Sequence, residues 1–161
     1  MNGKLRNMAS VYIKNGDKML LLERIGSKVV ARSWCGIGGH FENEELNDAK
    51  AAVLREMNEE IGLTESDLDN LKLRYVALRN VNDELRINYY FFADLKETAV
   101  INEECNEGIL EWVDLDKVGE RKMPVTAQHV IKHYLEVGAN TDNLYAVSVD
   151  NKDNVSIVSL S

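Results

Sequence analysis

The stretch that predicts the fold is residues 34–63, WCGIGGHFENEELNDAKAAVLREMNEEIGL. Its second part, residues 47–61, has the composition of a helix with two unlike faces. Glu56, Glu59 and Glu60 share one face, because they are spaced i, i+3 and i+4. Apolar residues lie on roughly the opposite face and suit a core: Ala51, Leu54, Met57 and Ile61. We therefore expect a core-packed helix that presents three carboxylates together.

The three glutamates need a neutralising partner, because like charges at this spacing repel and weaken a helix. Hard divalent cations such as Mg²⁺ bind carboxylate oxygens and keep waters and substrate phosphates as further ligands. Residues 36–39, GIGG, read as a glycine-dense loop, and glycine lets backbone atoms approach a phosphate or metal closely. An acidic helix face in solvent is the plain alternative for the glutamates alone. The added presence of the glycines, Arg55 and a helix-ending Gly62 favours a metal–phosphate site.

The same residues resemble the Nudix box of the Nudix (MutT-like) pyrophosphohydrolases. That pattern is a glycine, five residues, a glutamate, seven residues, and then Arg-Glu-apolar-any-Glu-Glu-any-Gly-apolar. Residues 55–63 match its second part at every position, and Gly39 followed by Glu45 fits its first part. The spacer departs from the pattern, because the nine residues 46–54 separate Glu45 from the arginine. We interpret this as a longer loop before the helix, which leaves open whether Glu44, Glu45 or neither is the loop glutamate of the family.

The resemblance implies a metal site and a hydrolytic reaction. The metal would be Mg²⁺, with Mn²⁺ as a substitute, held by Glu56, Glu59, Glu60 and the carbonyl of Gly38. The reaction would be attack of water on a bridging pyrophosphate.

The resemblance also implies catalytic residues. Glu59 is the first choice for orienting or deprotonating the water, and Arg55 belongs to the same catalytic set. Family members often carry a further glutamate before a tryptophan-containing strand such as residues 108–115. Glu107 fits that place best and Glu104 second, and a solvated acidic loop is the plain alternative.

Substrate contacts are expected from the glycine segment and its flanks. The candidates are Arg32, Trp34, Gly38, Gly39 and His40. The plain alternatives are a solvated side chain for Arg32, a core position for Trp34 and a loop position without a role for His40.

The loop sequence looks MutT-like, so we expect a nucleoside triphosphate, oxidised purine nucleotides included, cleaved to the monophosphate and pyrophosphate. In MutT-type enzymes an asparagine near the start of the last core helix holds the base. The corresponding place here is Ala127, with Gln128 beside it, which speaks against strict oxidised-guanine specificity. ADP-ribose, nucleotide sugars and dinucleoside polyphosphates are alternatives within the enzyme class. A non-catalytic nucleotide-sensing module is the alternative outside it, although such a module is expected to have lost box glutamates.

Composition bounds the remaining possibilities. The chain has 161 residues and a formal net charge of −8, which suits one domain with a real core and argues against polymeric nucleic acid as a partner. No apolar run approaches the roughly 20 residues of a membrane span, and the N-terminus lacks a signal-peptide core. Two cysteines are too few for a disulfide framework. We expect a cytoplasmic protein that binds a small nucleotide, with a homodimer as one option for its assembly.

Hydrophobic patterning predicts an α+β domain with a mixed β-sheet sandwiched between helices, as in the Nudix fold. Asn47 or Asp48 is expected to cap the first helix. Residues 86–90 alternate, and the pattern leaves open which face lines the pocket. The expected core is residues 6–137 of a single domain 1–161, and residues 141–161 form a β-hairpin appended to it. The expected strands are residues 8–14, 18–24, 33–37, 71–78, 85–95, 108–115, 143–149 and 155–160, with a second helix at 125–136.

Overall fold

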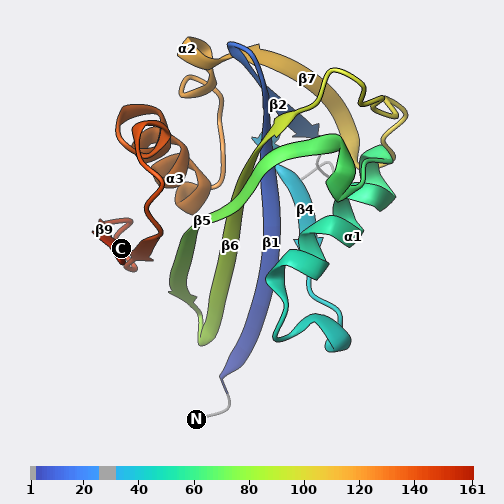
Figure 1. Cartoon of the computed structure of the whole chain (residues 1–161). Coiled ribbons are helices and arrows are strands. Elements are labelled where there is room, and N and C mark those ends of the chain that lie inside the picture. Colours follow the sequence, from blue (N-terminus) through green and yellow to red (C-terminus); the bar gives the residue numbers. More distant parts are fainter. Residues whose placement is uncertain (1–2, 26–31) are drawn as a thin grey trace.

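A computed structural model describes residues 3–25 and 32–161. One large mixed sheet lies between two helices, α1 on one face and α3 on the other (Figure 1), so the expected α+β sandwich is confirmed. None of the helices in the described ranges is long and apolar enough to cross a membrane. The elements in chain order are β1 (Lys4–Asn15), β2 (Lys18–Arg24), β3 (Ser33–Cys35), β4 (Ile37–His40), the 3₁₀ turn η1 (Asn43–Glu45), α1 (Ala49–Ile61), η2 (Glu65–Asp67), β5 (Leu68–Val81), β6 (Glu84–Leu95), β7 (Gly108–Asp114), α2 (Leu115–Val118), α3 (Val125–Glu136), η3 (Gly138–Asn140), β8 (Tyr145–Val149) and β9 (Val155–Ser159).

The sheet has the strand order β3-β2-β1-β6-β5-β8-β9, with β4 also paired to β1 and β7 to β2. β1 runs parallel to β6 and β5 runs parallel to β8, whereas the other pairs are antiparallel. Asn82 and Asp83 join β5 to β6 with φ angles of 51° and 61°. Two positive φ angles are what a tight two-residue hairpin needs, so this turn is shorter than the sequence suggests.

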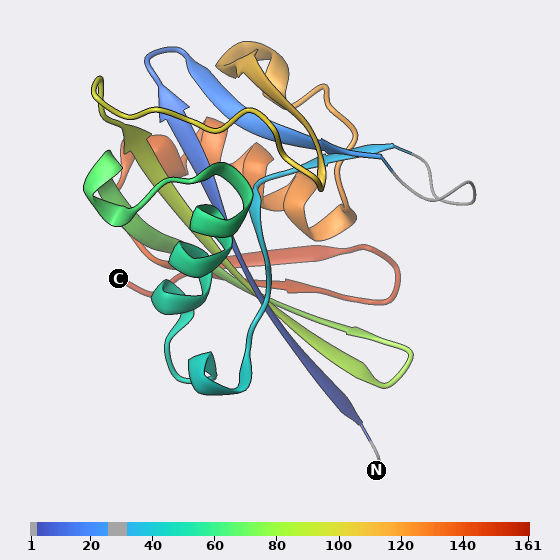
Figure 2. The ribbon, with the colours of Figure 1, turned by 90° about the vertical axis from the view of Figure 1, so that its right-hand side faces the viewer.

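The glycine segment is part of the sheet, not the loop that the sequence predicts. β3 pairs with β2, and after Gly36 the chain changes partner, so that β4 pairs with residues 8–11 of β1. A Cβ on Gly36 would lie 2.8 Å from the Val11 carbonyl oxygen. Because Gly36 has no side chain, its backbone can lie close to Val11 of β1. At this point the chain leaves β2 and pairs with β1 (Figure 2).

The termini of α1 follow the predicted chemistry. Asp48 is the N-cap and its Oδ1 accepts a hydrogen bond from the Ala51 amide at 2.9 Å. Gly62 ends the helix with a φ of 73°, the left-handed conformation that glycine adopts without steric cost.

The buried face of α1 differs from the prediction. Its buried residues are Ala52, Val53, Met57 and Ile61, whereas Ala51 and Leu54 are only partly buried. At 100° per residue, Glu56 and Glu60 fall within this buried stripe, not opposite it. Because β4 offers a glycine backbone without side chains, these two carboxylates lie against the sheet, and the helix is rotated accordingly.

The C-terminal hairpin continues the main sheet. β8 pairs in parallel with β5, and three of its residues are buried in the core under α3: Tyr145, Val147 and Val149. Arg74, which is 6% exposed, donates to three backbone carbonyls in the connection from α3: Gly138 at 2.7 Å, Thr141 at 2.6 Å and Asn143 at 3.0 Å. This one side chain thus fastens the hairpin to β5.

Candidate functional site

The candidate site lies between β4 and α1, beside the division of the sheet. A Cβ on Gly38 would overlap the Ala9 carbonyl oxygen of β1, and a Cβ on Gly39 would lie 2.6 Å from Glu56 Oε1. The two glycines therefore let β4 lie against the neighbouring strand on one side and a glutamate of the helix on the other.

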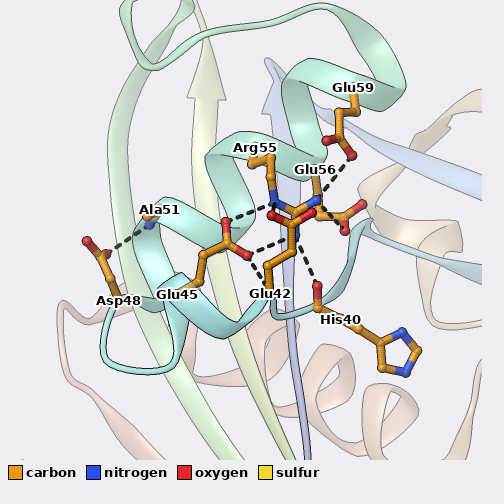
Figure 3. A network of polar contacts seen from close by, with 8 residues as sticks. All are labelled: His40, Glu42, Glu45, Asp48, Ala51, Arg55, Glu56 and Glu59. Carbon is orange, nitrogen blue, oxygen red and sulfur yellow. Dashed lines mark hydrogen bonds and ion pairs between the residues drawn. The ribbon is translucent and has the colours of Figure 1, made fainter.

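Arg55 is the centre of the polar network at this site (Figure 3). Its Nε and Nη2 atoms donate to Glu45 Oε2 and Oε1, each at 2.9 Å. Its Nη1 atom donates to Glu56 Oε1 at 3.0 Å and to Glu59 Oε2 at 3.1 Å. Nη2 also donates to the His40 carbonyl oxygen at 3.0 Å. One guanidinium thus ties two helix glutamates to the preceding loop and to the end of β4.

Of the two candidate loop glutamates, Glu45 is the one that reaches the arginine. It is buried, with 7% of its surface exposed, whereas Glu44 is exposed. Its Oε1 also accepts from the Glu42 amide at 2.9 Å, which closes the 3₁₀ turn η1. Hydrogen bonding to Arg55 lowers the pKa of the Glu45 carboxyl. The nine-residue spacer begins directly after this turn and passes through the N-cap Asp48 into α1.

Glu60 is a half-buried carboxylate whose Oε2 atom has no hydrogen-bond partner within the described part of the chain. Burial, and next the negative charge of Glu56, raise its pKa to about 7. Glu107 acts in the same direction, and Arg24 opposes the shift. A carboxylate that burial and like charges make hard to ionise is stabilised by an added cation.

This arrangement fits a divalent cation by its chemistry. In residues 3–25 and 32–161, no three His, Cys, Asp or Glu side chains form a ready-made metal-binding group. Arg55 binds one oxygen each of Glu56 and Glu59, while Glu60 keeps a free buried oxygen beside them. Carboxylate oxygens, together with a backbone carbonyl such as that of Gly38, are the hard donors that Mg²⁺ prefers.

Arg24, at the end of β2, is a cation of this site that the sequence reasoning missed. Its Nη2 atom lies 3.5 Å from the Gly38 carbonyl oxygen, and its charge lowers the pKa of Glu60. Its Nε atom is buried without a partner among the described residues. The one sequence signal was an arginine that ends a strand of continuous apolar residues, KMLLLER, at residues 18–24.

A cavity of about 330 Å³ adjoins the glycines on the α3 side of the sheet. Arg86, Asn88 and Tyr90 of β6 line it. The face of β6 that carries these three side chains is therefore the one turned to the cavity. The intervening Tyr89 and Phe91 pack in the core on the α1 side.

The start of α3 forms another wall of the cavity. Ala127, the residue at the place of the base-holding asparagine, lines it, whereas Gln128 does not. The Gln128 side chain instead bonds the backbone before the helix: its Oε1 accepts from the Met123 amide at 3.3 Å, and its Nε2 donates to the Arg121 carbonyl at 3.4 Å. Neither residue offers a side-chain amide to this cavity.

Three predicted substrate contacts lie outside the lining of the cavity. His40 is exposed at the end of β4. Trp34 packs against the core under α3, with the Arg121 guanidinium 5.1 Å from the centre of its ring. Arg32 is exposed and lies 3.3 Å from Glu23. Gly38 and Gly39 do line the cavity.

The acidic loop before β7 brings one glutamate near the site. Glu107 precedes Gly108, which pairs with Arg24 in the sheet, and its charge contributes to the raised pKa of Glu60. Glu104 is exposed, and its amide donates to Asn102 Oδ1 at 3.1 Å. Of the two, Glu107 is the one placed within electrostatic reach of the helix glutamates.

Residues 4–134 match the model of the NUDIX domain family. The chain is similar to the MutT protein from Bacillus halodurans, with 21% identity and a TM-score of 0.66 over 96% of this chain and 97% of that chain. The MutT protein from Methanosarcina mazei Go1 has 20% identity and a TM-score of 0.66, covering 88% and 99%. An Ap4A hydrolase from C. elegans has 16% identity and a TM-score of 0.65, covering 84% and 99%. At these identities the likeness to solved structures establishes a shared fold.

Proposed function

The chain belongs to the Nudix hydrolase family, and from this premise we propose a Mg²⁺-dependent enzyme that cleaves a nucleoside diphosphate linked to a further group. Hydrolysis of a phosphoric anhydride bond is the activity of the family, so the chain is a hydrolase of that class. The finer statements, which are the metal, the substrate and the residue roles, are our proposal.

The observation that carries the proposal is the free buried oxygen of Glu60 beside Glu56 and the glycines of β4. Glu56, Glu59, Glu60 and the Gly38 carbonyl would hold the metal ion. When bound, the ion neutralises phosphate charge and lowers the pKa of coordinated water. An unpaired carboxylate oxygen in a half-buried position is costly unless a cation or donor meets it, which supports this placement.

Each protein group then has a separate task. Arg55 is a positioning residue, because four of its hydrogen bonds hold glutamates and the fifth is to the His40 carbonyl. Glu59 is exposed and has one oxygen outside the arginine contact, so it is our first choice for orienting or deprotonating the attacking water. Glu107 is the second choice, because it lies within reach of the same charges. Arg24 would bind a phosphate of the substrate beside Gly38.

For the substrate, a nucleoside triphosphate cleaved to the monophosphate and pyrophosphate is our first candidate, in line with the likeness to MutT proteins. Because Ala127 offers no side-chain amide to the cavity, we propose no strict oxidised-guanine specificity. The alternative substrates are ADP-ribose, nucleotide sugars and dinucleoside polyphosphates. An Ap4A hydrolase among the similar structures supports the last of these. A non-catalytic sensing module is the alternative outside the enzyme class.

A panel of nucleotides with Mg²⁺ tests the proposal, with phosphate, pyrophosphate and nucleotide products measured for the wild type, Glu59→Gln and Glu97→Gln. We expect turnover of at least one substrate, with kcat lowered about 100-fold or more in Glu59→Gln, the range of general acid–base contributions. Glu97 is exposed and serves as the matched control. Nucleotide binding without turnover would contradict the enzyme and favour the sensing module.

The metal is tested separately by thermal unfolding. Millimolar Mg²⁺ should raise the melting temperature of the wild type, because a ligand that binds only the folded state stabilises it. The rise should be lost in Glu60→Gln and kept in Glu97→Gln. A melting temperature that Mg²⁺ leaves unchanged in all three proteins would count against the metal site.

A further inference from the structure

From the lining of the cavity we infer that the substrate carries a second anionic group, a phosphate remote from the anhydride that is cleaved, and that Arg6, Arg79 and Arg86 bind it. The inference rests on the proposed function, because it concerns the substrate of the same site. The observation behind it is a row of arginines on three adjacent strands, Arg6, Arg86 and Arg79, which we call the arginine row.

The three arginines are direct neighbours in the sheet. Arg6 of β1 pairs in register with Arg86 of β6, and Arg86 pairs with Arg79 of β5. All three line the cavity, so their side chains share one face. Like charges directly opposite each other destabilise a sheet, so this row costs free energy unless anions neutralise it.

The carboxylates of the chain neutralise the row only in part. Glu84 Oε1 accepts from Arg86 Nε at 2.7 Å and lies 3.8 Å from Arg6 Nη1, so one carboxylate serves two guanidiniums. Arg79 Nη2 donates to Asp153 at 2.5 Å, but its Nε atom is buried without a partner in the described ranges. The arginine side chains remain 35%, 38% and 21% exposed for Arg6, Arg86 and Arg79. Arg6 Nε donates to His40 Nε2 at 2.6 Å, and the three side chains keep exposed surface at which a further anion can bind.

The charge of the cavity contrasts with that of the chain. Among residues 3–25 and 32–161, its lining contains four arginines and no aspartate or glutamate, although the chain has a net charge of −8. The fourth, Arg24, lies at the glycine end, beside Gly38. Gly38 pairs with Ser10, and four residues along β1 at about 3.3 Å each place Arg6 roughly 13 Å away. The lining therefore places a guanidinium at each of two separated ends, and at the glycine end that of Arg24 lies within electrostatic reach of Glu60.

Between these ends the lining is neutral. Met8 and Asn88, which pair in register, lie on the same cavity face as the arginine row, and Ala127 contributes from α3. A sugar or similar uncharged spacer fits this middle part, with an anhydride phosphate near Arg24 and the second phosphate at the row.

A phosphate explains the row better than a nucleobase does. One arginine suffices to bind the two acceptors of a guanine edge. Three adjacent guanidiniums with unused donors match the several charged oxygens of a phosphate, which arginine binds in bidentate geometry. The phosphate could belong to a phosphorylated sugar of the nucleotide or to a phosphorylated group on the other side of the anhydride, and the chemistry at the row is the same.

Binding without metal tests the inference independently of catalysis. Calorimetric titration in EDTA compares AMP, ADP, adenosine 2′,5′-bisphosphate and adenosine 3′,5′-bisphosphate. ADP matches the bisphosphates in number of phosphates but carries both at the 5′ end. We expect one bisphosphate to bind about tenfold or more tightly than ADP, because a charged hydrogen-bonded contact is gained. Arg86→Gln should remove this preference, and Lys132→Gln, an exposed position on α3, should keep it.

A second arm uses ribose 5-phosphate, which lacks the nucleoside, to separate the two sources of the phosphate. If Arg86→Gln weakens the binding of ribose 5-phosphate but of neither bisphosphate, the arginine row binds the phosphorylated group on the other side of the anhydride. Equal affinities for ADP and both bisphosphates, together with no Arg86-dependent binding of ribose 5-phosphate, would overturn the inference. Tighter binding of GMP than of any bisphosphate would overturn it in favour of base recognition.

Hydrolysis assays keep the two proposals apart. ADP-ribose and its 2′-phosphate are compared with Mg²⁺. Hydrolysis of both at equal kcat/KM, unchanged by Arg86→Gln, would leave the proposed function standing and remove the support for the phosphate row. Absence of hydrolysis of any nucleotide, with the bisphosphate preference intact, would defeat the proposed function and leave the anion site in place.

Discussion

Arg55 holds Glu45 through two parallel hydrogen bonds, from Nε to Oε2 and from Nη2 to Oε1, each 2.9 Å long. This pairing connects the loop before α1 to the helix glutamates, because the remaining nitrogen of the same guanidinium binds Glu56 and Glu59. The orientation of the catalytic carboxylates therefore depends on a side chain ten residues earlier in the chain.

Glu45→Gln should remove the charge and one acceptor of this pair. We expect the free energy of unfolding to fall by roughly 1–3 kcal/mol, because a nearly buried charged hydrogen bond is lost, and kcat to fall with it. Urea unfolding and steady-state kinetics measure both. The matched control is Glu44→Gln, whose exposed carboxylate should change the stability by less than about 0.5 kcal/mol. Equal effects of the two variants would contradict the assignment of Glu45.

Gly39→Ala should impair activity far more than stability. The added Cβ would lie 2.6 Å from Glu56 Oε1, the mobile end of a side chain, so the carboxylate moves and the fold survives. Displacement of a site group by about 1 Å lowers rates by about 100-fold, which is the loss of kcat/KM that we expect. Gly119→Ala is the control, since its Cβ would meet its nearest neighbour only at 4.0 Å. An active Gly39→Ala enzyme would show that Glu56 need not lie against β4.

His133 should contribute a loss of stability in mild acid. Burial lowers the pKa of this imidazole, which lies 2.7 Å from the Tyr75 hydroxyl through Nδ1. The unfolded chain, with a histidine pKa of about 6.5, therefore takes up the proton first as pH falls. The contribution of His133 to the free energy of unfolding is expected to decline as pH drops below about 6.5, towards the lower pKa of the folded state. It opposes the gain from Glu60, whose pKa is about 7 in the folded state. On going from pH 7.5 to 5.5, the urea midpoint of the wild type should fall relative to that of His133→Gln, and the same change in both proteins would refute this origin.

Arg74→Met should loosen the C-terminal hairpin. The arginine donates to the carbonyls of Gly138, Thr141 and Asn143, and its loss removes one donor from each, although the Gly138 carbonyl keeps the Thr141 amide. We expect a loss of about 2 kcal/mol or more in the free energy of unfolding, with kcat unchanged for the molecules that remain folded. Lys72→Gln, on the same strand and exposed, is the control for charge. A parallel loss of kcat in Arg74→Met would indicate that the hairpin supports the site.

The order of elements and the sandwich could be predicted from sequence because each element has its own local signal. Asp48 and Gly62 mark the ends of α1 by capping chemistry, and the apolar run in β2 marks a strand buried on both faces. The glycine segment misled the prediction, because strand pairing of GIGG depends on contact with Val11 and its neighbours on β1.

The motif residues were found by their spacing, whereas their partners required the three-dimensional structure. Spacing could not distinguish Glu44 from Glu45, because that depends on which one reaches Arg55 after the 3₁₀ turn. Arg24 belongs to no motif, because its approach to Gly38 depends on β2 and β4 pairing with the same strand, β1. The arginine row likewise follows from strand pairing that no local pattern reports.

The most direct test of the central claim is the Mg²⁺-dependent rate of hydrolysis for the best nucleotide substrate, measured for the wild type, Glu60→Gln and Glu97→Gln. The free buried oxygen of Glu60 predicts that the Glu60→Gln rate falls by about 100-fold or more at any Mg²⁺ concentration, since one stabilising electrostatic group is removed. The Glu97→Gln rate should equal that of the wild type. Full activity in a folded Glu60→Gln protein would contradict the account.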